Sequence, residues 1–245
     1  MPYRSSDFKE GLSFHIISRA VEERKILNDE NDCYRFIFQI NAANLGRPNY
    51  NLHRMDIIKC AKSLLRGEKV SDKFIIKEHS PLVHILDFAF NVTHYHFHLL
   101  PTGRGSLSEF MYKLNMGFAK YFNLKHNRKG SLFGGRYKSV PIETDFQLDA
   151  VGRYVSIINP LDVYQPGWRE KGLKDPQKAF EFLKNYQFSS FPDRIRKRKS
   201  SILAPEEILE KYCLKENSKE DYISFTKDFL SDSKSFPKKI FGQFN

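Results

Sequence analysis

The chain has little of what marks a secreted, membrane-bound or cysteine-rich protein. Its 245 residues include three cysteines, Cys33, Cys60 and Cys213, which are odd in number and far apart. They offer neither a disulfide framework nor a cysteine-type zinc site, so we expect reduced, buried thiols. No apolar run is long enough to span a membrane, and no signal peptide is expected at the first residues. We therefore expect a cytoplasmic protein with no membrane partner.

Several common catalytic motifs are also missing. The sequence contains no Gly-x-Ser-x-Gly elbow, no Walker-type phosphate loop and no internal repeat. No paired-carboxylate nuclease centre is evident near its cluster of histidines. These absences argue against a serine hydrolase, a nucleotide-driven enzyme and a repeat protein.

Positive charge and aromatic side chains are abundant. The formal net charge is +11, the sequence pI is about 9.4, and 14% of the residues are aromatic. A basic chain favours a polyanionic partner, and nucleic acid is the usual one. Aromatic rings on which unstacked bases can settle favour single strands. The alternatives are a merely basic soluble protein and rings that belong to the core.

The most informative stretch is His94-Tyr95-His96-Phe97-His98, which follows a β-prone run from 82 to 90. Side chains alternate faces along a strand, so the three histidines are expected on one face and the aromatic residues on the other. Neighbouring imidazoles on a stiff element can hold a divalent metal. The alternative is a half-buried strand whose polar face happens to carry histidine.

The rest of the chain predicts an α+β protein, an antiparallel sheet with packed helices. Strands are expected at 11–19, 82–90, 93–101 and 136–143, and helices at 33–40, weakly at 55–65, from Ser106 onward, and from Thr144 to Asn159-Pro160. Ser106 with Glu109 and Thr144 with Gln147 have capping-box spacing. The polar stretch from about 41 to 78 is expected to be an excursion. Short helices are expected at 178–186, 206–212 and 221–230, beyond a soft boundary near residue 165.

Five blocks, in order, resemble the REP-associated tyrosine transposases, within the single-tyrosine HUH transposases of insertion sequences. The resemblance covers roughly Phe14 to Trp168. Its blocks are residues 14–20 with 25–27, the histidine strand 96–100, the helix 110–123, the glycine-and-basic block 130–139, and Arg153-Tyr154-Val155 with Asn159-Pro160-Leu161.

The resemblance implies a ferredoxin-like antiparallel sheet with helices on one face and the histidines on a central strand. It implies a catalytic domain over residues 1–165, with an insertion at about 41–78. Residues 166–245 would then form a basic, helical extension able to bind DNA. A monomer and a homodimer both remain open.

The resemblance also implies a mechanism. His96 and His98 would hold Mg²⁺ or Mn²⁺ on the phosphate of single-stranded DNA. The substrate would be hairpin-forming palindromic DNA, and the protein would be associated with the nucleoid. The Tyr154 phenolate would attack, leaving a 3′-OH and a 5′-phosphotyrosine that a second 3′-OH can reverse. Tyr137 is a rival nucleophile that ranks below Tyr154.

Two positions depart from the family pattern. Tyr95 stands where the family has Asn before the first histidine. Asn159, the third expected ligand, lies five residues after Tyr154 instead of four, so Ile158 takes the aligned position. A local bulge could restore Asn159, and His94 or water could take its place.

Ten basic residues are candidates for DNA contacts, with solvated surface charge or a polar linker as the alternative. They are Arg19, Lys125, Arg128, Lys129, Arg136, Lys138, Arg194, Arg196, Lys197 and Arg198. The other histidines, including His15, are expected to be structural or surface residues, and Trp168 a core anchor.

Two other functions remain open. One is a domesticated DNA-hairpin-binding protein that has lost catalysis, which the shifted Asn159 favours. The other is a replication initiator or relaxase with the same histidine strand, although such enzymes usually carry extra domains or a tyrosine pair.

Overall fold

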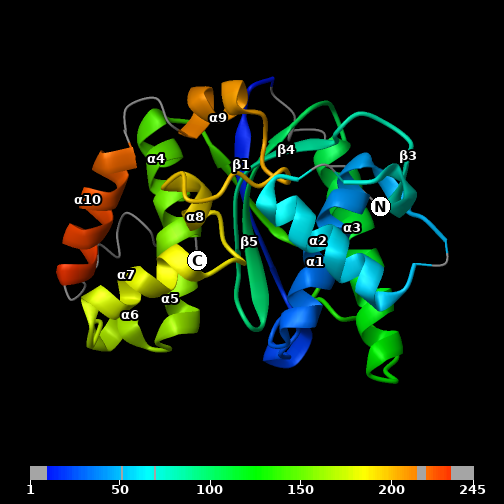
Figure 1. Ribbon diagram of the computed structural model, residues 1–245, viewed down its shortest axis with the longest axis horizontal. Helices are drawn as coiled ribbons and strands as arrows, with labels where there is room; N and C mark the ends of the chain where they lie inside the picture. Colours follow the sequence, from blue (N-terminus) through cyan, green and yellow to red (C-terminus); the bar gives the residue numbers. More distant parts are fainter. Residues whose placement is uncertain (1–9, 51, 69, 214–218, 233–245) are drawn as a thin grey trace.

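The computed structural model describes residues 10–50, 52–68, 70–213 and 219–232. A central sheet separates two groups of helices, as Figure 1 shows. The expected mixed α+β architecture, with a four-stranded antiparallel sheet, is confirmed. No helix in the described ranges is both long enough and apolar enough to cross a membrane.

The main sheet has the strand order β4-β5-β1-β6. Its strands are β1 (Ser13–Arg19), β4 (Val83–Phe90), β5 (His94–Pro101) and β6 (Lys138–Ile142). A tight connection at 91–93 joins β4 to β5, which is the hairpin that the sequence predicts. Two short strands, β2 (Gly46–Pro48) and β3 (Ile75–Lys77), form a separate pair within the excursion.

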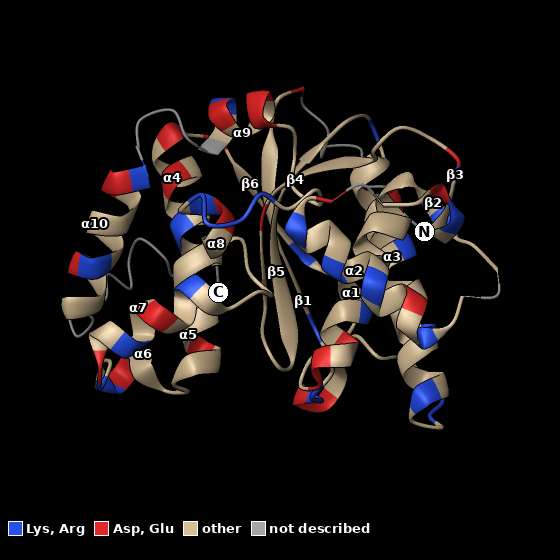
Figure 2. Ribbon diagram, in the orientation of Figure 1, with Lys and Arg blue, Asp and Glu red and all other residues tan. Residues whose placement is uncertain are grey.

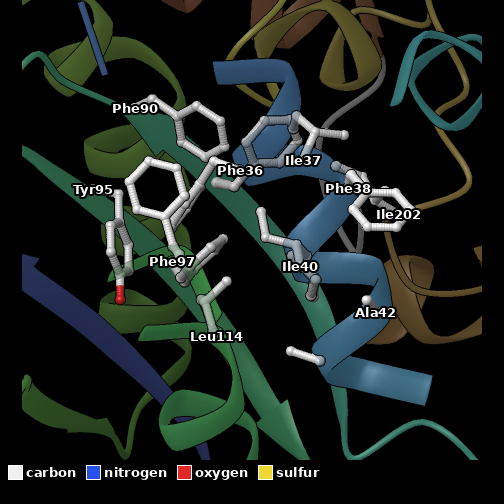
Figure 3. Close-up of a cluster of buried hydrophobic side chains, with 14 of the residues drawn as sticks. Phe36, Ile37, Phe38, Ile40, Ala42, Phe90, Tyr95, Phe97, Leu114 and Ile202 are labelled. Atoms are coloured by element: carbon white, nitrogen blue, oxygen red, sulfur yellow. The ribbon is translucent and has the colours of Figure 1, made fainter. Parts of the chain in front are cut away.

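One face of the sheet is covered by α1 (Glu30–Leu45), α2 (Arg54–Arg66) and α3 (Ser106–Lys125). Alternating residues of the strands, such as Tyr95 and Phe97 of β5, point into this core. Figure 3 shows them against Phe36 of α1 and Leu114 of α3. This apolar face fixes the strand register, because a one-residue slip would turn its aromatic rings to the other side.

The second group of helices packs on the opposite face. It comprises α4 (Asp145–Arg153), a π-helical turn (Tyr154–Ile158), α5 (Asn159–Tyr164), α6 (Trp168–Lys171), α7 (Pro176–Asn185), α8 (Phe191–Arg194) and α10 (Lys219–Ser231). The helix α9 (Glu206–Cys213) contacts α4 and β4. This group has a core of its own, which includes the fully buried Trp168, as expected.

The expectation that helices cover only one face of the sheet is therefore wrong. The histidine face also carries Ala89 of β4 and Ile142 of β6, and both belong to the second core. Leaving such apolar surface in water is unfavourable, so this face needs a covering layer as well. Besides Ala89, the second core takes side chains from both sides of residue 165, from Ile142 to Leu230.

Local details also differ from the sequence expectations. The capping box at Thr144 and Gln147 is confirmed, but Gly105 caps α3, and the Ser106 hydroxyl donates to the Gly103 carbonyl at 2.8 Å. The helix also does not end at Asn159-Pro160. Pro160 stands at the start of α5, directly after the π-helical turn.

Candidate active site

The strand pairing brings the histidine strand beside a further histidine. The expected HUH pair lies on β5, which runs between β4 and β1, and His15 of β1 faces the same side. His15 Nε2 and His96 Nδ1 lie 3.0 Å apart and share a buried hydrogen bond. The rings of His94 and His96 have their centroids 5.1 Å apart. The imidazoles of His15, His94 and His96, from two strands, thus form one contiguous cluster, which we call the imidazole group.

His98 belongs to a different set of contacts. Its Nε2 lies 2.9 Å from the Ser13 hydroxyl, and its Nδ1 lies 3.6 Å from Asp87 Oδ2. Asp87 is paired in turn with Arg194, whose Nε donates to Asp87 Oδ1 at 2.8 Å. The register of β4 shifts between Ile85 and Asp87, which sets the carboxylate opposite His98. The register shift therefore directs the Asp87 side chain toward His98, and β-bulges commonly orient side chains in this way.

Tyr154 lies against the imidazole group. Its ring centroid is 5.5 Å from that of His15 and 5.7 Å from that of His96, edge-on in both cases. The tyrosine comes from the covering layer and the histidines from the sheet, so their meeting depends on how the two pack. Tyr154 is only 1% exposed, and His96 is equally buried. Tyr154 and His96 are therefore closed to solvent in this conformation, whereas His94 is partly exposed.

A π-helical turn places Asn159 against Tyr154. The backbone N–H of Asn159 donates to the carbonyl of Tyr154, five residues earlier. The side-chain Nδ2 donates to the same carbonyl at 3.0 Å. A five-residue repeat puts residues i and i+5 on one side, where an α-helix would put i and i+4. The extra residue between Tyr154 and Asn159 is thus taken up by this turn.

Burial keeps the histidines neutral. It lowers the pKa of His15 and of His94 to about 3 each, and at His94 the charge of Arg19 acts in the same direction. Burial and the neighbouring histidines hold the pKa of His96 well below its usual value. Burial also lowers the pKa of His98, although Asp87 opposes it. Neutral imidazoles keep a lone pair, which metal binding requires.

The phenol of Tyr154 is held in its protonated form. Burial raises its pKa, and the positive charge of Arg169 works in the opposite direction. The Arg169 guanidinium carbon lies 5.6 Å from the centre of the Tyr154 ring. Asp162 orients this arginine, accepting from its Nε at 3.0 Å and from its Nη2 at 2.6 Å. Arg169 is therefore the cation best placed to favour a phenolate.

The expected metal ligands fit an ion only in part. His96 Nε2 and Asn159 Oδ1 are buried and have no hydrogen-bond partner within the described residues. Both are donor atoms that Mg²⁺ or Mn²⁺ accepts. His98 does not fit in this conformation, because Ser13 occupies its Nε2 and its other nitrogen faces Asp87. Over the same residues, no three side chains of His, Cys, Asp or Glu form a metal-binding group.

Among the basic candidates for DNA contacts, two lie on the sheet near the imidazole group. Arg19 ends β1 opposite His94, and its charge acts on Tyr154 and the neighbouring histidines. Lys138 of β6 is exposed and pairs with Ile17, so it shares the face of His15. Arg136 is exposed just before β6. The glycine-and-basic block is attached here, since Gly134 N–H donates to the Arg19 carbonyl at 2.9 Å.

The other candidates lie elsewhere. Lys125, Arg128 and Lys129 stand at the end of α3, where Lys125 pairs with Asp29 and Asp32. Arg194 and Arg198 are mostly buried and paired, with Asp87 and Asp193. Arg198 also donates to the carbonyls of Gln187 and Ser189. In the basic segment beside α8 in Figure 2, only Arg196, Lys197 and Lys199 are exposed.

Three residues of this site were not assigned to it from the sequence: His15, Asp87 and Arg169. The alternation of Phe14, His15 and Ile16 places His15 on the polar face of its strand, but strand order is needed to put it beside β5. Tyr137, the rival nucleophile, packs against the core between the sheet and α1, α2 and α3, on the other side of the sheet from the histidines.

No protein-family model and no curated protein matches this chain. Among solved structures, it is similar to one described as a REP-associated tyrosine transposase bound to a REP hairpin. That likeness has 13% sequence identity and a TM-score of 0.42, and it covers 84% of this chain and 92% of the other. A likeness of this degree assigns no function to the chain.

Proposed function

We propose that this protein is a metal-dependent enzyme that cleaves and rejoins single-stranded DNA through a 5′-phosphotyrosine on Tyr154. The substrate would be DNA with hairpin-forming palindromes. Support comes from the sequence blocks, from the contact of the Tyr154 ring with His96, and from the hydrogen bond of the Asn159 side chain to the Tyr154 carbonyl. The π-helical turn carries the proposal, because it removes the one departure from the family spacing that would have displaced Asn159.

The topology is compatible with this proposal. Without the excursion and the second helical group, the chain runs β1, α1, β4, β5, α3, β6, with sheet order β4-β5-β1-β6. A β-α-β-β-α-β order of this kind is the ferredoxin-like arrangement. We interpret the fold as ferredoxin-like, with the second helical group added on the histidine face.

A divalent ion, Mg²⁺ or Mn²⁺, would be held by His96 Nε2 and Asn159 Oδ1, and by His98 once its ring leaves Ser13. Bound there, it would withdraw charge from the scissile phosphate. His15 would orient His96 through their shared hydrogen bond, leaving Nε2 of His96 for the ion. His94 would keep its place through contacts of its two ring nitrogens with Asn91 and Thr93.

The chemistry at Tyr154 needs a phenolate and an in-line phosphate. Arg169 favours loss of the phenol proton to solvent. The phenolate oxygen then bonds to phosphorus, the bond from phosphorus to the 3′ oxygen breaks, and that oxygen takes a proton from solvent. The products are a 5′-phosphotyrosine and a free 3′-OH. A second 3′-OH can reverse the attack without nucleotide hydrolysis, because the phosphodiester energy is kept in the tyrosine ester.

The contacts with DNA would begin at Arg19 and Lys138, which are exposed on the sheet near the imidazole group, and would include Arg136, which is exposed just before β6. Exposed cations bind phosphates without reading sequence, so these residues would position the strand. Because Tyr154 is almost fully buried, a strand has to open the contact between the sheet and the second helical group. We propose that DNA binding drives that opening.

The second candidate is a DNA-hairpin-binding protein without catalysis. Burial of Tyr154 favours it, as does the engagement of His98 by Ser13 and Asp87. The same exposed cations would serve such a protein.

One experiment separates the two candidates. The protein is incubated with a labelled single-stranded hairpin oligonucleotide and Mn²⁺, and adducts are separated on a denaturing gel. An adduct that is lost in Tyr154→Phe but kept in Tyr164→Phe supports the enzyme. Binding of the hairpin with no adduct in Mg²⁺ or Mn²⁺ supports the binding protein.

A further inference from the structure

A small cavity with an excess of positive charge lies at the junction of α1, α2 and α3, on the opposite side of the sheet from Tyr154. Its volume is about 230 Å³. Asn31 and Arg35 line it from α1, Arg54 and two isoleucines from α2, and Tyr121 and Lys125 from α3. Figure 2 shows basic residues on these three helices. None of the tyrosine chemistry proposed above uses this cavity.

Arg35 is the unusual member of this group. Its guanidinium carbon lies 5.1 Å from the ring centre of Phe38 and 5.3 Å from that of Tyr121. Its Nη1 is buried, with no hydrogen-bond partner within the described ranges. No ion pair of Arg35 is found among the same residues. Burial lowers its pKa to about 10, which still leaves it charged at neutral pH. A buried charge without a counter-ion is costly.

The neighbouring groups leave this charge uncompensated. Lys125 is neutralised by Asp32 at 2.7 Å and Asp29 at 3.3 Å, and Tyr121 also donates to Asp32. Arg54 is exposed and is the first residue of α2, where the helix dipole disfavours a cation. In the described part of the chain Arg54 has no ion pair either. Arg35, Arg54 and Lys125 thus bring three positive charges against the two carboxylates of Asp29 and Asp32, and neither Arg35 nor Arg54 has an ion pair among the described residues.

We propose that this cavity binds a phosphate group of a compact anion, with Arg35 and Arg54 as its ligands. A guanidinium presents parallel N–H donors that match phosphate oxygens, and Nη1 of Arg35 is a donor without a partner. Two guanidinium groups suit an anion whose several oxygens each accept a hydrogen bond. The cavity is smaller than the pockets of about 300 Å³ or more that enclose drug-sized ligands. The phosphate could come from solution or from the end of a nucleic-acid strand.

Calorimetric titration of the full chain with inorganic phosphate, in a buffer of low ionic strength, tests the proposal. Arg35→Gln and Arg54→Ala are each expected to weaken binding about tenfold or more, the range for a lost charge-assisted hydrogen bond. Arg104→Ala removes an exposed cation between β5 and α3 and is expected to change nothing. Phosphate should raise the melting temperature of the wild type but not that of Arg35→Gln.

Equal weakening by Arg54→Ala and Arg104→Ala would overturn the proposal, since it would mean that only overall charge matters. Unchanged binding in Arg54→Ala would overturn it too, and this exposed variant decides the matter if Arg35→Gln fails to fold. Competition identifies the source. Displacement of phosphate only by a 5′-phosphorylated trinucleotide indicates a strand end, and no displacement by any trinucleotide indicates a free anion. Equal displacement by the unphosphorylated trinucleotide would contradict a compact phosphate.

Discussion

The side chain of Asn159 donates a hydrogen bond of 3.0 Å to the backbone carbonyl of Tyr154, five residues before it. The same carbonyl also accepts the backbone N–H of Asn159, closing one π-helical turn. An inserted residue in a helix usually costs stability, and such turns are frequent at functional sites. Here the turn keeps a buried amide oxygen, Asn159 Oδ1, close to the backbone of the proposed nucleophile.

Replacing Asn159 with Ala is expected to affect the reaction more than the fold. The Tyr154 carbonyl keeps its backbone donor, and Oδ1 has no partner to lose. The free energy of unfolding should therefore fall by only about 1 kcal/mol. Adduct formation on a hairpin oligonucleotide with Mn²⁺ should fall by about a hundredfold or more, because removing a metal ligand should cost at least as much as the loss of about 10- to 100-fold seen for the partners that orient such ligands. Urea unfolding measures the change in stability, and the denaturing gel measures adduct formation. Full adduct formation in this variant would show that Asn159 is not part of the active site.

Arg169 is expected to set the pH dependence of the reaction. Burial raises the pKa of Tyr154 and Arg169 lowers it, so adduct formation should increase with pH as the phenolate forms. Removing the charge in Arg169→Gln leaves burial unopposed, and the rise should move to higher pH. The rate of adduct formation from pH 6 to pH 10 measures this shift. A lower rate with an unchanged profile would mean that Arg169 acts only through packing.

The buried pair of Asp87 and Arg194 is expected to be a major contributor to stability. Arg194→Met leaves the Asp87 carboxylate buried without its cation, a change that costs about 3–5 kcal/mol. Arg196→Met, at an exposed position two residues later, should change the free energy of unfolding by less than about 0.5 kcal/mol. Urea titrations of the two variants give the comparison. Similar stabilities would show that the basic segment is merely solvated.

The same pair predicts how acid affects the fold. Burial acts to raise the pKa of Asp87, but Arg194 and the hydrogen bonds hold it below its usual value. The unfolded chain then binds this proton at higher pH than the folded one. The stability from Asp87 is therefore present above about pH 4, the ordinary carboxyl pKa, and is lost as the pH falls through the lower folded value. The Asp87→Asn/Arg194→Met double variant should lose less stability than the wild type between pH 5 and pH 3. An identical loss would contradict this assignment.

The two described cysteines are expected to be unreactive in the folded protein. Cys33 and Cys60 are buried, and burial raises the pKa of Cys60 to about 12 and that of Cys33 as well. The thiolate is the reactive form, so a thiol reagent at pH 8 should modify neither residue until denaturant is added. In a Cys213→Ser background only Cys33 and Cys60 can react, so the number of modified thiols is unambiguous. Fast labelling of either thiol in the native state would contradict the burial described here.

The sequence contains the pattern of the histidine strand, but not its neighbours. Period-two alternation is enough to place His96 and Phe97 on opposite faces, because it depends only on strand geometry. Strand order brings His15 beside His96, and a register shift in β4 brings Asp87 opposite His98. Both are set by long-range packing, which local pattern does not encode. The extra residue between Tyr154 and Asn159 left a local bulge as one of three alternatives, because the spacing of the pair is itself local.

The basic segment shows the opposite case. Six consecutive residues from 194 to 199 include five cations, which normally indicates a solvated surface. Arg194 and Arg198 are nevertheless held inside by carboxylates, one of which lies 107 residues away in the chain. Burial of a charged residue is determined by such distant partners, so composition misplaces these two arginines. For Arg196 and Lys197 the composition predicts the right environment, because both side chains are exposed.

The most direct test of the proposed chemistry is to locate the covalent bond. The protein is reacted with a hairpin oligonucleotide and Mn²⁺, then digested with nuclease and trypsin and analysed by mass spectrometry. The account predicts a nucleotide remnant on the peptide from Tyr154 to Arg169, which persists in Tyr164→Phe and disappears in Tyr154→Phe. A remnant on Tyr137 or on any other residue, or hairpin cleavage that survives in Tyr154→Phe, would contradict it.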